Sequence, residues 1–157
     1  MATTVHDATM TVTVNEDIIL NGHQVGSKTI QKIDGINEAS RRILTVTTEP
    51  ETEILALSSS AGRGTYSSSD LQYIRVTNLD DTNFVRLTFV SGTSEETARK
   101  ANRFDVKLEA ERTMIFTNPS ISGSNENLAF TSFNDFTDLK ATANTASVDI
   151  ELFVASK

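Results

Sequence analysis

Apolar and polar residues alternate along much of this chain. Between Ser147 and Ala155 every second residue is Val, Ile or Leu, and the acidic residues Asp149 and Glu151 stand between them. Met10–Val14 shows the same period of two. Because successive side chains of a β-strand point to opposite faces of a sheet, this period predicts strands with one apolar and one polar face.

Shorter apolar runs bounded by Gly, Pro, Asn, Asp or Ser indicate further strands. Serine and threonine together make up about a quarter of the chain and there are 2 prolines, and a threonine-rich, proline-poor composition suits strands. The expected strands, about ten in number, are Met10–Val14, Ile18–Leu20, a strand after Lys28, Arg42–Thr47, Glu53–Leu57, Leu71–Thr77, Asn83–Val90, Phe104–Glu109, Thr113–Phe116, Leu139–Ala141 and Ser147–Ala155.

The segment Leu71–Val90 is the most regular of these. Two β-rich runs flank the polar connector Asn78–Thr82, and apolar residues recur at every second position in both runs. This pattern predicts a β-hairpin whose apolar side chains share one face.

Residues 28–44 allow two interpretations. Four isoleucines are spaced so that they could line one face of a helix, but isoleucine and Gly35 both lower helix propensity. We therefore predict a strand, a turn at Asp34-Gly35, a connector through Ser40 and then the strand Arg42–Thr47.

The remaining segments predict loops and at most one short helix. Ser58–Ser69 and Asn118–Asn127 are rich in small polar residues and breakers, which indicates two long loops. Ser91–Arg103 has a capping-box spacing but no apolar stripe, so a loop and a single helical turn are equally compatible with it. Leu128–Phe136 carries three phenylalanines at spacing three, which suits either a helical turn or a winding loop whose rings fill the core.

Together these elements predict an all-β protein: an antiparallel β-sandwich, jelly-roll-like, with about ten short strands and long loops. The 157 residues suit a single domain, 1–157. Residues 1–11 are expected either to act as an N-terminal arm that pairs with a neighbouring subunit, with Thr3, Thr4 and Val5 as contact residues, or to frame the first strand of their own sheet.

The composition of the chain excludes several kinds of site and partner. The chain has no cysteine, so disulfides, thiolate metal sites and thiol nucleophiles are excluded. A net charge of −7 argues against a nucleic-acid partner, which requires a basic surface. No apolar stretch is long enough for a membrane-spanning helix, and the first residues lack the pattern of a signal peptide.

No constellation of residues predicts catalysis, and we expect neither an enzyme nor a cofactor. The two histidines, His6 and His23, lie in expected N-terminal loops, away from any serine in a nucleophile-like turn. Gly62-Arg63-Gly64 superficially suggests a phosphate loop but lacks the Gly-Lys-Ser/Thr ending. Arg63 is instead a candidate contact residue on a loop tip, since arginine is enriched at protein interfaces.

Two further charged pairs are candidates for binding. Asp80-Asp81, with Asn78 and Asn83 nearby, could ligate calcium, but Asx-type side-chain hydrogen bonds that close a turn explain the same residues without an ion. Arg41-Arg42 stands at the start of a strand, either as part of a solvated face or as a salt-bridge donor to a neighbouring subunit.

Several segments resemble virion structural proteins of tailed bacteriophages, especially small β-sandwich proteins of marine phages. The resemblance lies in Tyr73–Asp80, a strand that ends in Asn-Leu-Asp, and in the following Phe84–Leu87. It continues in Phe104–Glu109 and Ala141–Glu151 and covers about half of the chain.

The resemblance implies a non-enzymatic particle component: a capsid decoration or cement protein that forms a homotrimer and binds the lattice of the major capsid protein. It implies synthesis in the host bacterial cytoplasm and a final place on the capsid exterior of the virion. The alternatives are a tail, neck or fibre component and, from a different class, a host-glycan-binding module, although the chain has no Trp and 2 Tyr to stack on a sugar.

Overall fold

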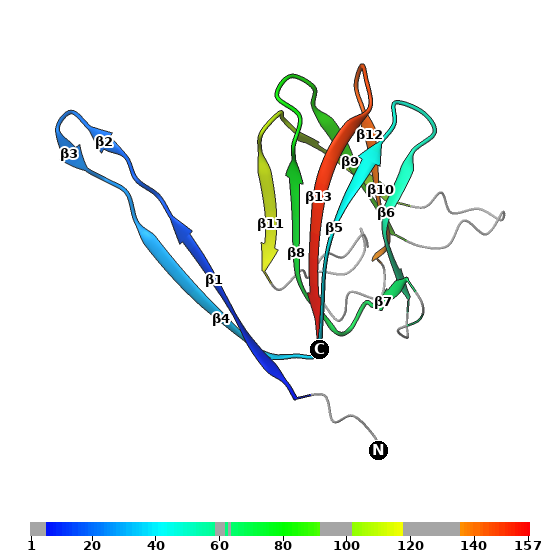
Figure 1. The fold of residues 1–157 in the computed structure, drawn as a ribbon, viewed down its shortest axis with the longest axis horizontal. Helices are drawn as coiled ribbons and strands as arrows, with labels where there is room; N and C mark the ends of the chain where they lie inside the picture. Colours follow the sequence, from blue (N-terminus) through cyan, green and yellow to red (C-terminus); the bar gives the residue numbers. More distant parts are fainter. Residues whose placement is uncertain (1–5, 59–61, 63, 92–101, 118–135) are drawn as a thin grey trace.

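The computed structural model describes residues 6–58, 62, 64–91, 102–117 and 136–157. These residues form strands and no helix, which confirms the all-β prediction. They are arranged as a two-sheet sandwich from which one long hairpin projects (Figure 1). The jelly-roll-like arrangement stays a prediction.

The projecting hairpin contains the first four strands. Strand β1 (Ala8–Asn15) pairs antiparallel with β4 (Lys28–Ile36). Farther out, the short strands β2 (Ile19–Leu20) and β3 (His23–Gln24) pair across the turn Asn21-Gly22. Both turn residues have positive φ, 51° and 81°, as a tight two-residue hairpin turn requires. We call the hairpin of residues 8–36 the arm.

The first sheet of the sandwich has four strands in the order β11-β8-β13-β5. Its central strands are β8 (Leu71–Asn78) and β13 (Val148–Ser156), and its edges are β11 (Thr113–Thr117) and β5 (Glu38–Val46). All of its pairings are antiparallel. In Figure 1 this sheet lies on the side from which the arm projects.

The second sheet has five strands in the order β10-β9-β12-β6-β7. Antiparallel pairing joins β10 (Asn102–Leu108), β9 (Val85–Ser91), β12 (Phe136–Ala143) and β6 (Thr52–Ser58). The edge strand β7 (Thr65–Ser67) is parallel to β6, an exception to the predicted antiparallel pattern.

The core lies between the two sheets and is built by the alternation seen in the sequence. In β13 the side chains of Val148, Ile150, Leu152 and Val154 are buried, as the period of two predicts. The same period buries one face of each neighbouring strand. The buried apolar residues of this core are Val46, Ile54, Leu55, Leu57, Tyr66, Leu71, Ile74, Val76, Val85, Leu87, Phe89, Leu108, Leu139, Ala141, Ala143, Val148, Ile150, Leu152 and Val154.

The prediction that Leu71–Val90 forms a hairpin is wrong. Its two runs are strands β8 and β9, but β8 pairs with β11 and β13, whereas β9 pairs with β10 and β12. The connector therefore crosses from one sheet to the other. The inward faces were predicted correctly, because a strand of either sheet directs its apolar side chains into the shared core.

Asn78 explains why the chain changes sheets at this point. Its side-chain Nδ2 donates hydrogen bonds to the carbonyl oxygens of Asn83 (2.8 Å), Glu109 (3.1 Å) and Leu108 (3.3 Å). Its Oδ1 accepts the backbone N–H of Asp80 (3.0 Å). Asn78 thus ties the crossover from β8 to β9 to the neighbouring crossover from β10 to β11.

The predicted turn at Asp34-Gly35 is also wrong, as is the connector through Ser40. Strand β4 continues to Ile36, and β5 begins at Glu38. Thr9 of β1 lies opposite both Asp34 and Gly35, because the register passes from Met10–Ile33 to Ala8–Ile36. Gly35, with φ of 78°, is therefore the extra residue of a β-bulge, which bends a strand without reversing it.

Other sequence expectations have mixed outcomes. The continuous loop expected over Ser58–Ser69 is interrupted by β7, because Tyr66 packs into the core. The strand predictions for Glu53–Leu57 and Thr113–Phe116 are confirmed. The helical turn or loop between Ser91 and Arg103, and the expectations for residues 118–135, fall almost entirely outside the described residues.

Replacing Asn78 with alanine should destabilise the sandwich by about 1–3 kcal/mol, because buried carbonyl groups of two crossovers would lose their donor. Urea unfolding followed by circular dichroism measures this change. Asn83→Ala is the matched control, since the Asn83 side chain is half-buried and makes one long hydrogen bond of 3.5 Å to Asp80. Equal destabilisation by both substitutions would contradict the role given to Asn78.

Candidate interaction surface

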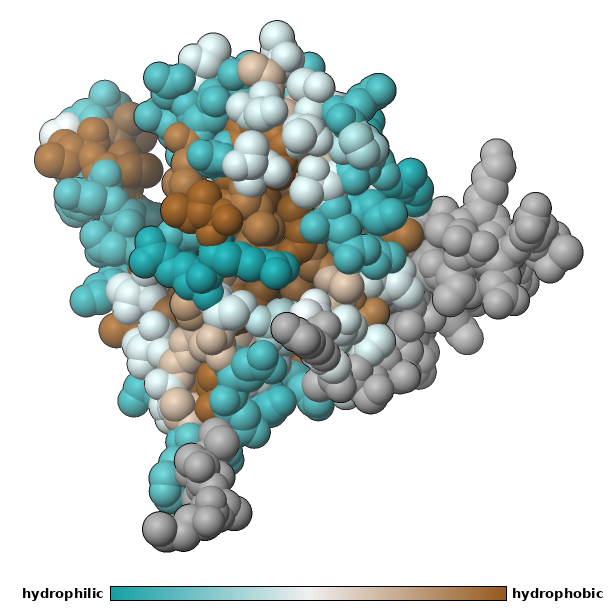
Figure 2. Space-filling view, turned by 45° about the vertical axis from the view of Figure 1, so that its right-hand side comes forward, coloured by the Kyte–Doolittle hydropathy of each residue, from teal (hydrophilic) through white to brown (hydrophobic). Residues whose placement is uncertain are grey.

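The end of the arm carries apolar side chains that its own chain does not cover. Ile18, Ile19, Leu20 and Val25 each expose between 54% and 72% of their surface. Figure 2 shows apolar side chains gathered at the end of the arm, and Figure 1 shows that this end stands apart from the sandwich. Exposed apolar clusters of this kind mark interaction sites on soluble proteins.

The sequence carries a signal for this surface that the period of two does not reveal. Ile18-Ile19-Leu20 is a run of three consecutive apolar residues next to a tight turn. In a two-stranded hairpin, consecutive side chains point to opposite faces. They cannot all pack against one sheet, so some must face solvent or a partner.

The base of the arm, in contrast, is packed against the sandwich. Val12, Ile33 and Ile36 are buried in a second apolar cluster with Tyr73 of β8 and Ala155 of β13. Met10 and Phe153 pack against the edge of the same cluster. A backbone hydrogen bond of 3.0 Å from Asn37 to the carbonyl of Ser156 adds to this anchor. The arm is therefore held at its base and free at its end.

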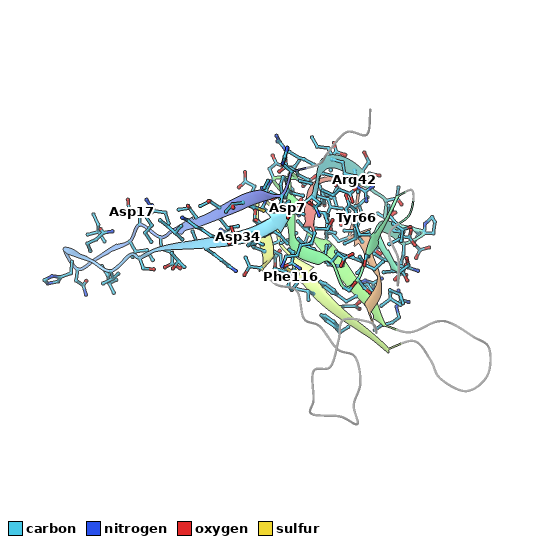
Figure 3. The ribbon with its side chains drawn as sticks, turned by 90° about the horizontal axis from the view of Figure 1, so that it is seen from below. Asp7, Asp17, Asp34, Arg42, Tyr66 and Phe116 are labelled. Carbon is cyan, nitrogen blue, oxygen red and sulfur yellow. The ribbon has the colours of Figure 1, made fainter. Side chains whose placement is uncertain are left out.

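The bulge at Gly35 lies within this anchored base. The Thr9 hydroxyl donates a hydrogen bond of 2.7 Å to the Asp34 carboxylate across the bulge. In Figure 3, Asp34 lies where the arm joins the sandwich and Asp17 lies toward its far end. The bulge therefore sits where the direction of the arm is set.

The arm base covers only one end of the outer face of the β11-β8-β13-β5 sheet. The next row across that face pairs Ile115 with Arg75, Arg75 with Phe153, and Phe153 with Arg41. Ile43 stands on the same face beside Glu151 and is 61% exposed. We call the uncovered set Arg41, Ile43, Arg75, Ile115, Glu151 and Phe153 the outer-face patch.

Glu151 is the electrostatic centre of the outer-face patch. It is almost fully buried, and its carboxylate binds Arg41 from β5 (2.5 Å between Nη2 and Oε2) and Arg75 from β8. The hydrogen bond from Arg41 is the main cause that holds the pKa of Glu151 below its ordinary value, with a further contribution from Arg75, against the opposing effect of burial. The three side chains join three adjacent strands.

The two predicted contact arginines have different roles in the structure. Arg41 points to the outer face and its salt bridge is made within its own chain, to Glu151, although 68% of its side chain remains exposed. Arg42 donates a hydrogen bond to the Ile54 carbonyl of the opposite sheet. Ser40 and Tyr66 join the same two sheets by a short hydrogen bond of 2.5 Å between their hydroxyls. Figure 3 places Arg42 and Tyr66 on the sandwich, away from the arm.

The other predicted contact residues, Thr3, Thr4, Val5 and Arg63, lie outside the described residues. The segment 8–11 of the predicted N-terminal arm pairs with β4 of its own chain.

The Asp80-Asp81 connector shows the Asx-type bonding weighed against a calcium site. The Asp80 Oδ1 accepts the backbone N–H groups of Asn83 (2.5 Å) and Thr82 (2.8 Å), and these hydrogen bonds lower the pKa of Asp80. The Asp81 carboxylate accepts the Thr82 hydroxyl at 2.8 Å. The acidic side chains are thus used to close the crossover.

Both histidines are exposed, His6 before β1 and His23 in β3 near the end of the arm. Within the described residues, no group of three or more His, Asp or Glu side chains is placed to hold a metal ion. No helix long and apolar enough to cross a membrane occurs in the part of the chain that the structure describes.

A polar hollow of about 500 Å³ lies where the arm meets the sandwich. Its lining has no histidine or serine from which a nucleophile and its base could be built. The lining residues are Gln31, Lys32, Ile33, Asp34, Gln72 and Lys157.

No family model, curated protein or solved structure matches this chain.

Replacing Gly35 with alanine should weaken the arm base by about 1 kcal/mol, because an L-residue at positive φ is strained. A Cβ at this position would meet only the flexible Lys157 side chain, at 3.5 Å or more, so the backbone angle is the cause of the loss. Hydrogen exchange of the β1 and β4 amides should be about fivefold faster. Gly62→Ala is the control: a Cβ at this position meets open space, so the exchange rates should not change. Unchanged amide exchange in Gly35→Ala would contradict the strain assigned to this position.

Replacing Glu151 with glutamine should destabilise the protein at neutral pH, because two arginines lose their carboxylate. Since the folded pKa is lowered, the stabilisation is complete above the ordinary glutamate value of about 4.3 and is lost as pH falls through the folded value. Urea unfolding of both proteins between pH 7 and pH 3 should show their difference shrinking. Glu109→Gln is the control, because Glu109 is exposed and binds Lys107. If the difference in stability between the unmodified protein and Glu151→Gln grew at low pH, the stabilising role given to the Glu151 carboxylate would be contradicted.

Proposed function

We propose that this chain is a non-enzymatic structural protein of a tailed-phage virion that decorates or cements the capsid shell by binding the lattice of the major capsid protein. The observation that carries the proposal is the arm: it is anchored at its base by Val12, Ile33 and Ile36, and it presents an uncovered apolar end. A projecting apolar element of this kind suits a protein that contacts other subunits.

The segments that resemble phage virion proteins support the same proposal. Tyr73–Asp80 is strand β8 with its exit from the sheet, and Ala141–Glu151 links the end of β12 to β13. These segments build the sandwich and the crossover at Asn78. The resemblance is thus carried by the framework that a particle subunit needs, and the arm is added to this framework.

Two positions count against the glycan-binding alternative. The chain has no Trp and its two tyrosines, Tyr66 and Tyr73, are both buried, so neither ring presents a face on which a sugar could stack. Tyr66 contributes to the main core, and Tyr73 packs under the arm.

A decoration protein gains strength from repetition. A shell presents many equivalent sites, so modest contacts add up when subunits are linked to each other as well as to the shell. A homotrimer on the capsid exterior is the form in which we expect the protein, after its synthesis in the host bacterial cytoplasm. The rigid sandwich supplies a fixed spacing, and the arm supplies a link.

The test is the copy number of the protein in purified virions, measured by quantitative mass spectrometry against the major capsid protein. Hundreds of copies per particle are expected. Purified protein added to expanded shells that lack it should bind and raise their melting temperature, whereas addition of an unrelated β-sandwich protein should not.

Three outcomes would overturn the proposal. A handful of copies confined to one vertex would assign the protein to the tail or neck. Affinity for host glycans with no binding to shells would make it a sugar-binding module. Absence from purified virions would remove it from the particle altogether.

A further inference from the structure

The end of the arm is uncovered in its own chain, and its chemistry indicates which kind of partner would fit it. Four apolar side chains, Ile18, Ile19, Leu20 and Val25, are exposed there. Two acids, Glu16 and Asp17, precede them. Their carboxylates accept hydrogen bonds from Ser27 (2.6 Å) and Gln24 (2.8 Å), and within the described residues neither forms an ion pair. The partner should therefore combine an apolar surface with basic donors.

The outer-face patch of the same protein has this chemistry. Ile43 and Ile115 are exposed on it, at 61% and 41%, and the half-buried Phe153 lies between their strands. Arg41 and Arg75 flank Phe153 in the register of the sheet and share one carboxylate, that of Glu151. Each guanidinium has five N–H donors, so both retain donors for a second acidic group.

The positively charged side chains of this face lie along one row of residues. Besides Glu151, the acid on this outer face is Asp149. It lies near the start of β13, away from Phe153, and its carboxylate accepts a hydrogen bond of 2.7 Å from the Thr45 hydroxyl. The row through Phe153 contains two arginines and no acid. An incoming arm that lies along this row therefore encounters positive charge.

The arm's own base already makes a contact of this kind. Val12 and Ile33 of the arm pack on Tyr73 and Ala155, which lie on the same outer face one row farther along the strands. The outer-face patch continues this surface directly. A second arm on the uncovered rows would extend a contact that the protein already uses within one chain.

A copy cannot cover its own arm end. From Ala8 to Asn21 an extended strand spans roughly 40 Å, whereas the longest strands of the sandwich, at 9 residues, span roughly 30 Å. With the base anchored, the arm diverges from the sandwich and its end stands clear of it (Figures 1 and 3). The end of the arm can therefore reach the outer-face patch only of another molecule.

We propose that the end of the arm of one copy binds the outer-face patch of a second copy, with Ile18–Leu20 against Ile43, Ile115 and Phe153 and with Glu16 and Asp17 facing Arg41 and Arg75. This contact joins two different surfaces, so it generates a closed ring or an open chain of copies. It adds a specific interface to the proposed function, and it depends on that function only in treating the protein as a subunit of an assembly.

The test uses two variants, one with a substitution at the end of the arm and one with a substitution in the outer-face patch. Ile19→Asp places a charge at the arm end, and Ile43→Asp places one on the patch; both positions are exposed, so the fold should be retained, which circular dichroism checks. By analytical ultracentrifugation the unmodified protein should self-associate, and each variant should be monomeric. An equimolar mixture should form a 1:1 complex, because the intact arm of the Ile43→Asp copy meets the intact face of the Ile19→Asp copy.

Leu79→Asp is the matched control. Leu79 is also an exposed apolar residue, but it lies in the crossover between the sheets, outside the arm and the patch. This variant should self-associate like the unmodified protein. If it also became monomeric, the loss of assembly in the other variants would be a general effect of added charge, and the proposed contact would be overturned.

Cross-linking supplies a second measurement that does not depend on weakening the contact. The chain has no cysteine, so Leu20→Cys with Ile115→Cys introduces the only two thiols. Oxidation should give a ladder of linked copies. Leu20→Cys with Leu79→Cys should give far fewer linked copies, and equal ladders from both pairs would overturn the contact.

The remaining outcomes distinguish other partners. A monomeric unmodified protein at high concentration, or an Ile43→Asp variant that still self-associates through its arms, would overturn the inference. The inference would also be overturned if the unmodified protein floated with phosphatidylcholine–phosphatidylglycerol vesicles and Ile19→Asp did not, because the arm would then bind lipid. A monomer that still binds capsid shells would contradict the contact between copies and leave the proposed function intact. An arm-linked assembly that is absent from virions would support the contact between copies and contradict the proposed function.

Discussion

The sandwich depends on one buried amide, that of Asn78. An asparagine side chain has two donor hydrogens and an acceptor oxygen, and here they serve carbonyl groups of Asn83, Leu108 and Glu109 and the N–H of Asp80. These groups belong to the two crossovers by which the chain moves between sheets. Backbone groups at such corners have no ladder partner, and leaving them unpaired in the interior is costly. One side chain therefore makes it possible for β8 and β9 to lie in opposite sheets.

The apolar side chains of the arm have different surroundings at its two ends. Its base, with Val12 and Ile33 packed on Tyr73 and Ala155, removes apolar surface from water within one chain. Beyond the base the apolar side chains continue, but the sandwich no longer reaches them. The Gly35 bulge lies in the packed part, so the direction of the whole arm is set by a few residues near the sandwich. The arrangement holds the exposed end at a defined place, which suits a contact between subunits.

Local pattern predicted the strands better than their partners. The faces of β13 and the inward positions of β8 and β9 were predicted correctly, because alternation alone decides which side chains share a face. The hairpin over Leu71–Val90 was wrong, since a polar connector of this composition suits both a hairpin and a crossover. The turn at Asp34-Gly35 was wrong for a related reason: a glycine at positive φ serves a turn and a bulge equally well.

The sequence by itself determined the all-β class, the segments that become strands and the side of each strand that is buried, because these depend on the period of neighbouring residues. Only the tertiary structure decided which strands pair and where the arm leaves the sandwich. It also brought together the triad of Arg41, Arg75 and Glu151, whose members are up to 110 positions apart in the chain. These features depend on hydrogen bonds and packing between distant segments, for which no local period carries information.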